Sequence, residues 1–291
     1  MMHYLLKLIF IIFRAIGEKK SSWVGKKIFL KLGPLTKFHD IALKNITIAF
    51  PKITILEKNR ILTKMWENIG SNFGEFIHIK SFDPFNDKRF KIKGKASLKK
   101  LIEKNKDSKK GIIFFSAHFG NWELGPLILS KLGLKPLCIY RKSNNKAVDL
   151  LVQNIRKDFA QYVPKGDSGA KKSYLWLRKG GSLAMLMDQK LNEGRKINFL
   201  GKPAFTATAI AELALRMELD VVPLKIKKEN NMFKIDFLNE LKLPNKNLPH
   251  NKKVDNILEQ VNSLMSSWIL ESPEQWLWIH RRWEKENYID F

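Results

Sequence analysis

The chain has 291 residues, of which 44% are hydrophobic and 11% aromatic, which suits one large α/β domain or two small ones and excludes a disordered protein. Lysine and arginine total 53 against 28 acidic residues, and the formal net charge of +25 favours polyanionic partners: nucleic acid, anionic lipid or an acidic protein. A lysine-rich composition spread over a solvated surface would explain the same excess. The single cysteine, Cys138, cannot form an internal disulfide and fits a reducing compartment.

The N-terminus, MMHYLLKLIFIIFRAIG, is the most apolar stretch of the chain. A bilayer-spanning helix needs about 20 mostly apolar residues, whereas this run is shorter and contains Lys7 and Arg14. A helix with its apolar side in the bilayer and both cations near the headgroups predicts an interfacial anchor over residues 1–17. An ordinary core helix is the alternative. No linker or repeat divides the rest, so residues 18–291 are predicted to form one domain.

The pattern of apolar residues predicts the elements that follow. Residues 58–77 have helical periodicity, and a polar segment covers residues 83–91. Four short apolar runs are typical of buried strands: 112–115, 137–140, 183–187 and 221–226. Helical patterns lie between them: 123–131, 147–159, 168–178 and 207–218. This alternation predicts an α/β fold with a mostly parallel central sheet flanked by helices. Residues 233–237 predict an added edge strand, and residues 254–270 a late helix.

The first predicted strand is followed by AHFGNWE, which places His118 and Glu123 five positions apart. Functional groups in open α/β sheets gather beyond the carboxyl ends of the strands. Along a continuous helix the two side chains would point about 140° apart, so they meet only if the chain turns at Gly120 and Asn121. Glu123 would then accept the imidazole N–H and leave the other ring nitrogen of His118 as a base. A core histidine beside a helix-capping glutamate is an equally open interpretation.

Other chemistries lack a matching pattern. The chain has no HExxH motif, no GxSxG elbow and no GxxxxGK[ST] loop, so zinc, serine-hydrolase and P-loop sites are not supported. No metal site is expected. The histidine–glutamate pair also brings no nucleophile of its own, which suits a reaction whose nucleophile is a substrate hydroxyl.

AHFGNWE has the His-x4-Asp/Glu signature of the glycerolipid acyltransferase superfamily. The chain resembles most closely the lauroyl/myristoyl acyltransferases of lipid A biosynthesis, the late acyltransferases of Gram-negative bacteria. The likeness follows the family order from about residue 45 to residue 283 through these blocks: NITIAFPKITILEK, IYRKSNN, GGSLAMLMDQK, FLGKPAFTATAIAELALRMELDVVPL and PEQWLWIHRRWE. The His-x4-Glu pattern alone is weak evidence for this family, whereas the five blocks in the family's order are strong evidence for it. The short, charged N-terminal run departs from the spanning helix expected there.

The resemblance implies a membrane-associated O-acyltransferase that moves a fatty acyl chain from acyl carrier protein to a hydroxyl of a lipid A precursor. His118 would be the general base, with Glu123 orienting it, and no acyl-enzyme would form. Backbone N–H groups at the start of the following helix would stabilise the oxyanion. No bound cofactor is implied, because the acyl carrier protein thioester is a co-substrate. The expected location is the cytoplasmic face of the inner membrane of a Gram-negative bacterium.

Further candidates lie at strand ends and in the family blocks. Arg141, directly after a predicted strand, would bind a phosphate or carboxylate of the acceptor, and Arg156 in the next helix is a weaker candidate for binding anions. Asp188 and Gln189 close another predicted strand and should reach the same face. Asp188 would position a basic residue or an acceptor hydroxyl, or would only cap a turn.

The C-terminal block mixes rings and cations: Trp276, Trp278 and Trp283 with His280, Arg281 and Arg282. Such a mixture suits a membrane interface or an anionic headgroup, where Arg281 would contact substrate, and it suits core packing with a basic rim equally well. His280 is a second, weaker candidate base.

The positive charge suits the implied partners, which are acidic acyl carrier protein, a phosphorylated lipid A precursor and an anionic membrane surface. One alternative keeps the chemistry and changes the acceptor to another glycolipid or aminolipid, or the donor to acyl-CoA. A more distant alternative is a non-catalytic basic protein that binds membranes or nucleic acid. No nucleic-acid-binding motif is evident, so no nucleic acid partner is expected.

Overall fold

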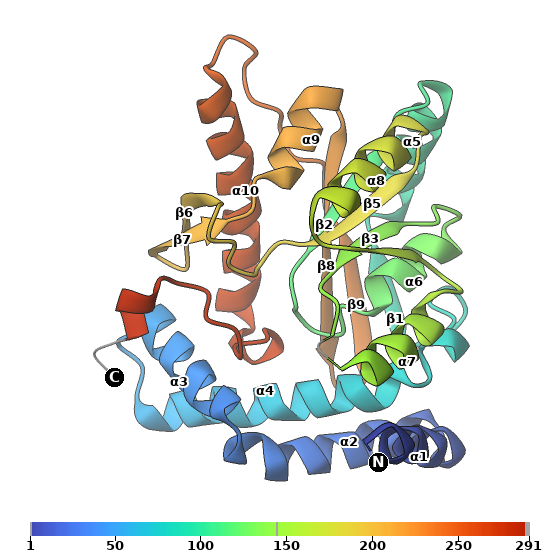
Figure 1. The fold of residues 1–291 in the computed structure, drawn as a ribbon, viewed down its shortest axis with the longest axis vertical. Helices are drawn as coiled ribbons and strands as arrows, with labels where there is room; N and C mark the ends of the chain where they lie inside the picture. Colours follow the sequence, from blue (N-terminus) through green and yellow to red (C-terminus); the bar gives the residue numbers. More distant parts are fainter. Residues whose placement is uncertain (1, 144, 289–291) are drawn as a thin grey trace.

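The computed structural model describes residues 2–143 and 145–288 and has a mixed α/β architecture around a seven-stranded sheet (Figure 1). The sheet has the strand order β1-β9-β8-β2-β5-β3-β4, and a separate hairpin joins β6 to β7. The strands are β1 (Phe90–Lys93), β2 (Ile112–Ser116), β3 (Leu137–Tyr140), β4 (Gln161–Pro164), β5 (Ser182–Leu186), β6 (Arg195–Phe199), β7 (Lys202–Thr206), β8 (Asp220–Glu229) and β9 (Met232–Phe237).

The helices alternate with these strands through the middle of the chain. They are α1 (Met2–Ile16), α2 (Glu18–Leu32), α3 (Lys37–Ala49), α4 (Ile55–Phe76), α5 (Lys95–Asp107), α6 (Leu124–Lys131), α7 (Lys146–Arg156), α8 (Asp167–Arg178), α9 (Ala209–Met217) and α10 (His250–Glu271). The predicted strands correspond to β2, β3, β5 and β8, and the predicted helices between them to α6, α7, α8 and α9. The predicted fold class is therefore confirmed.

Strand β2 lies in the middle of the sheet and is parallel to both neighbours, β5 and β8. All five of its residues are buried, which explains its continuous apolar sequence. Ile113 and Phe115 join the apolar cluster that contains α9 and α10, while Ile112 and Phe114 join the cluster that contains α5 and α6. Both faces of β2 are therefore covered by apolar residues of the flanking helices.

Strand β9 corrects the predicted edge strand. It pairs antiparallel with β8, but β1 covers its other side in parallel register, with Phe90 opposite Phe233. The rings of these two phenylalanines stack with centroids 4.7 Å apart. The sequence FKIK is too short and too polar to predict a strand by itself, so β1 forms because β9 offers it a partner and an aromatic ring.

Helices α2 and α4 lie side by side beneath the sheet in the view of Figure 1, and small residues let their backbones touch. A Cβ atom on Gly25 would lie 2.2 Å from the carbonyl oxygen of Gly70, and one on Gly74 would lie 2.2 Å from that of Ser21. Helix α4 begins with a capping box between Thr54 and Glu57. The close α2–α4 contact brings polar residues of α4 beneath the loop that follows β2.

The predicted N-terminal anchor corresponds to α1, whose Phe13 is buried against Phe73 of α4 with ring centroids 5.6 Å apart. Other side chains of α1 lie at the surface: Leu8, Ile11 and Ile12 are 53%, 64% and 48% exposed. Within the part of the chain that the structure describes, no helix is both long enough and apolar enough to cross a bilayer.

Candidate active site

The loop that joins β2 to α6 carries His118, and its path depends on Gly120. This glycine has a φ angle of +57°, and a Cβ atom at this position would lie 2.1 Å from the backbone oxygen of Ile226 on β8. Both conditions restrict the position to glycine. The chain therefore turns sharply after the strand, as predicted, and α6 begins at Leu124 with Glu123 at its N-cap.

The C-terminal segment pairs with this loop. Phe119 and Trp276 form an antiparallel bridge, the Gly120 N–H donates to Gln275 O at 2.9 Å, and the Leu277 N–H donates to His118 O at 2.9 Å. The loop thus behaves as a short strand against the last segment of the chain. This pairing fixes the backbone of His118 between two segments far apart in sequence.

Helix α4 holds the same loop from below through two polar residues. Asn72 Nδ2 donates to the carbonyl of Gly120 at 2.6 Å, and Glu75 accepts from Asn121 Nδ2 at 2.8 Å. Glu75 is 1% exposed, and its carboxylate also contacts Ser22, Ser71 and Lys228. These donors offset the cost of burying its charge. The helical periodicity of α4 indicated its apolar residues but gave no sign of these contacts.

His118 forms its hydrogen bond with Asp188, not with Glu123. The register of β2 and β5 places Ser116 opposite Leu186, so His118 and Asp188 each lie two residues beyond a paired strand end. His118 Nδ1 lies 2.9 Å from Asp188 Oδ1, while Asp188 Oδ2 accepts from Trp276 Nε1 at 2.8 Å. The prediction that Asp188 positions a basic residue matches this contact, and the predicted pairing of His118 with Glu123 is wrong.

Burial and neighbouring charges have opposite effects on the pKa values of His118 and Asp188. Burial by itself lowers the pKa of His118, but the Asp188 carboxylate more than offsets it, so the pKa is raised from its ordinary value. Burial likewise disfavours charge on Asp188, yet His118 and the indole of Trp276 lower the pKa of Asp188 to about 2. Asp188 is therefore ionised near neutral pH and holds His118 by its Nδ1–H, which leaves Nε2 directed elsewhere.

Glu123 instead forms an ion pair with Arg156 of α7. Arg156 Nε lies 3.0 Å from one carboxylate oxygen, and a guanidinium nitrogen contacts the other. The guanidinium also lies over the rings of Tyr162 and Phe76, 4.9 and 5.6 Å from their centroids. The predicted anion-binding arginine thus binds a carboxylate of its own chain. Glu123 still acts on His118 through space, because its negative charge helps to raise the histidine pKa.

The remaining predicted residues lie around this centre. Arg141 is exposed directly after β3, and its charge helps to lower the pKa of His280. Gln189 is partly buried next to Asp188. Arg281 is exposed, with its guanidinium 5.8 Å from the ring centroid of Tyr288.

The structure decides between the two interpretations of the C-terminal tryptophans. Trp276, Trp278 and Trp283 are 2%, 0% and 1% exposed, so they belong to the core. Arg282 is also buried and donates to Phe205 O and Thr206 Oγ1 at 2.7 and 2.8 Å. Burial lowers the pKa of Arg282 to about 10. Of the basic side chains in this segment, those of His280 and Arg281 are exposed at the surface.

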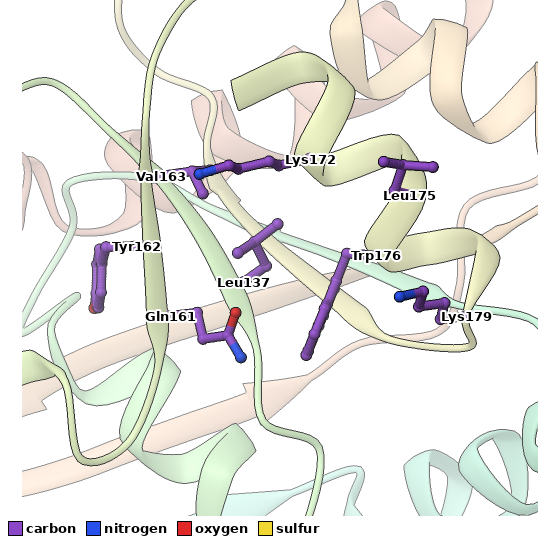
Figure 2. A pocket seen from close by; sticks show the side chains of 8 residues that line it. All are labelled: Leu137, Gln161, Tyr162, Val163, Lys172, Leu175, Trp176 and Lys179. Carbon is purple, nitrogen blue, oxygen red and sulfur yellow. The ribbon is translucent and has the colours of Figure 1, made fainter. Parts of the chain in front are cut away.

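Cys138 is buried on β3, and burial raises the pKa of its thiol to about 12, which makes it an inert apolar residue. A surface pocket nearby is lined by residues of β4 and α8, by Lys179 directly after α8, and by Leu137, the first residue of β3 (Figure 2). It lies at the amino ends of these strands, opposite the end that carries His118. The His118–Asp188 pair is therefore not in this pocket.

Four of the backbone N–H groups around the start of α6, where an oxyanion is expected to be stabilised, already have acceptors. Those of Phe119 and Gly120 donate to Ala117 O and Gln275 O, and those of Leu124 and Gly125 donate to Asn121 O and Trp122 O. Over residues 2–143 and 145–288, no three His, Cys, Asp or Glu side chains lie close enough together to hold a metal ion. The site as built offers an oriented histidine base for a nucleophile supplied by a substrate.

Comparison with known proteins agrees with this chemistry. Residues 1–285 match the model of one protein family, whose description is bacterial lipid A biosynthesis acyltransferase. No individual curated protein matches the chain.

Proposed function

The chain belongs to the bacterial lipid A biosynthesis acyltransferase family and is an acyltransferase; from this premise we propose that it transfers a fatty acyl chain from acyl carrier protein to a hydroxyl of a lipid A precursor. The observation that carries the proposal is the hydrogen bond from His118 Nδ1 to Asp188, 2.9 Å long. It fixes the tautomer with a basic Nε2, which suits a nucleophile that the substrate supplies.

In the proposed reaction His118 Nε2 takes the proton of the acceptor hydroxyl while the hydroxyl oxygen attacks the thioester carbonyl carbon. A tetrahedral oxyanion forms, the C–S bond breaks, and the proton passes from Nε2 to the leaving thiolate. The products are the new ester and the free thiol of the carrier, so no acyl-enzyme forms. Asp188 stabilises the imidazolium, and base catalysis of this kind contributes about 10²–10⁴-fold in rate.

Glu123 and Arg156 have a supporting role in this proposal. Their ion pair spans from the start of α6 to the end of α7, next to His118. The Glu123 charge favours the imidazolium that forms during transfer, and Arg156 holds that carboxylate in place. Arg141, Gln189 and Arg281 remain the proposed contacts for the acceptor's anionic groups.

We also propose that residues 1–17 attach the chain to the anionic cytoplasmic face of the inner membrane as an interfacial helix. Exposed apolar side chains on α1 support this: Leu8, Ile11 and Ile12. Helix α2 adds Trp23, which is 61% exposed, with Lys27 Nζ 5.8 Å from its ring centroid. A ring and a cation side by side suit the headgroup region of an anionic bilayer.

Flotation with vesicles tests the attachment. The wild type should bind vesicles that contain phosphatidylglycerol. The double variant with Ile11→Asp and Trp23→Asp should not bind them. The matched control is Leu243→Asp, which is 44% exposed in the segment between β9 and α10. Equal binding of all three proteins would contradict the proposed anchor.

The reaction is tested with a labelled acyl chain on acyl carrier protein and a purified tetra-acylated lipid A precursor, with products read by mass spectrometry. The wild type should give a penta-acylated product, and His118→Ala should give none. His250→Ala is the matched control, because His250 forms a comparable pair with Glu212 at 3.0 Å on the surface. Product from another glycolipid or aminolipid only, or from acyl-CoA only, would overturn the proposed acceptor or donor and keep the chemistry.

A further inference from the structure

His280 lies in the C-terminal segment that pairs with the His118 loop, and its backbone is held by a buried residue of α3. Asn45 is 0% exposed and its Nδ2 donates to the carbonyl oxygens of Trp278 and His280 at 2.5 and 2.7 Å. The hydroxyl of Tyr288 donates to Asn45 Oδ1 at 2.5 Å. The segment is thus fixed immediately before and at His280, although this residue itself remains accessible to solvent.

The two imidazole rings lie close together. The ring centroids of His118 and His280 are 6.0 Å apart, with the planes inclined by 58°. Reacting atoms in a productive complex lie about 3–3.5 Å apart, and the ring separation is short enough for one substrate to contact both histidines, with its hydroxyl at His118 and the thioester carbonyl at His280. Trp122 packs edge-on against His118, with ring centroids 5.3 Å apart.

The charges around His280 favour the neutral imidazole. Burial by neighbouring atoms lowers its pKa first, and the positive charges of protonated His118 and of Arg141 lower it further, against the opposing effect of Asp188. A neutral imidazole carries one N–H donor and one acceptor. Within residues 2–143 and 145–288, no hydrogen bond of the structure uses the His280 ring, so its N–H is available to a ligand.

Four backbone N–H groups near His118 are already engaged. The N–H groups of Phe119, Gly120, Leu124 and Gly125 already donate to backbone carbonyls. An oxyanion that forms on the thioester carbonyl is stabilised by a donor that is already in place before the reaction, and the His280 backbone is fixed by Asn45.

We propose that His280 is a second catalytic residue, whose ring N–H donates a hydrogen bond to the oxyanion that forms on the thioester carbonyl. This assignment rests on the acyl-transfer function proposed above. As the acceptor oxygen attacks, the carbonyl π electrons move onto the oxygen that faces His280, and they return when the C–S bond breaks. His280 transfers no proton, while His118 carries the hydroxyl proton to the leaving thiolate.

Steady-state kinetics of His280→Ala, His280→Gln and the control His250→Ala test the assignment. Removing an oxyanion donor costs about 10²–10³-fold in kcat, so His280→Ala should lose kcat by that factor with little change in either KM. Gln keeps an N–H donor, so His280→Gln should retain at least about tenfold more kcat than His280→Ala. A kcat of His280→Ala near that of wild type, or a loss confined to KM, would overturn the assignment.

A second readout separates this assignment from the choice of acceptor. Slow hydrolysis of the acyl carrier protein thioester by water, with no lipid present, passes through the same oxyanion. The wild type should hydrolyse the donor faster than either His118→Ala or His280→Ala. If only lipid transfer fails, the acceptor is wrong and the assignment of His280 stands. If wild type and His280→Ala hydrolyse the donor equally, His280 is not the oxyanion donor.

Discussion

The indole N–H of Trp276 donates a 2.8 Å hydrogen bond to Asp188, which lies 88 positions earlier in the chain. Both side chains are buried, at 2% and 3% exposure. The other oxygen of the same carboxylate holds His118 Nδ1 at 2.9 Å. A buried residue of the C-terminal segment therefore fixes the carboxylate that orients the candidate base, and the two contacts can be separated by substitution.

Asp188→Asn tests the orientation of His118. Its amide is nearly the same size but carries no charge, so both the preferred tautomer and the stabilised imidazolium are lost. We expect a fall of about 10²–10⁴-fold in kcat/KM. Because Asp188 raises the pKa of His118 against the effect of burial, the acid limb of the pH profile of the residual activity should move to lower pH. An acid limb in the same place as in the wild type would contradict the assigned pair.

The same variant should change stability in a pH-dependent manner. Asp188 has its pKa lowered to about 2, so its contribution to stability is present above its unfolded value and is lost as the pH falls through about 2. His118 has a raised pKa, so its contribution is present below its unfolded value and is lost as the pH rises through the folded value.

The free energy of unfolding should therefore differ most between wild type and Asp188→Asn from about pH 4 to about pH 6.5, between the two unfolded values. Urea titrations at pH 3, 5.5 and 8.5 measure this difference. A difference that is constant over the three pH values would show that the two groups are not coupled.

Trp276→Phe removes the indole donor and keeps an aromatic ring. The lost hydrogen bond to a charged acceptor should cost about 1.5–3 kcal/mol in the free energy of unfolding. The activity should also fall, because Asp188 loses one of its two fixed contacts. Trp278→Phe is the matched control: it is equally buried, but its indole donates to Pro273 O at 2.7 Å. Both variants should be less stable, and only Trp276→Phe should change kcat and the pH profile.

A double-mutant cycle tests the pair of Glu123 and Arg156. Their side chains are 12% and 17% exposed, so removing one partner leaves a largely buried charge. Glu123→Ala and Arg156→Ala should each lower the free energy of unfolding by about 3–5 kcal/mol. The double variant should lose much less than the sum, because no unpaired charge remains. Additive losses, measured by urea titration, would contradict a direct ion pair.

Gly120→Ala tests the turn beneath His118. A Cβ atom there would lie 2.1 Å from Ile226 O, and the φ angle of +57° is itself unfavourable for alanine. Gly133→Ala is the matched control, since Gly133 has a φ angle of +85° and nothing within 4 Å of a Cβ atom. The control should cost about 1–2 kcal/mol in the free energy of unfolding, from backbone strain alone. Gly120→Ala should cost clearly more and abolish transfer; equal costs would mean that β8 does not confine this turn.

Local patterns in the sequence determined much of this architecture. The apolar run of β2 predicted a buried strand, because a strand covered on both faces has no polar side. The alternation of strands and helices predicted the mostly parallel sheet. Gly120 and Asn121 predicted the turn that presents His118. Each of these features depends on residues that are close together in the chain, so it can be predicted from the sequence alone.

Only the tertiary structure decided which carboxylate meets His118. Glu123 is five residues away, but the turn directs it to Arg156 on the next helix. Asp188 is 70 residues away, and the register of β2 with β5 brings it to His118. That register is a pairing between strands that are far apart in the sequence, and Trp276 is placed by the pairing of the C-terminal segment with the His118 loop. Such contacts depend on which segments pack together, and the spacing of residues within one segment does not predict that packing.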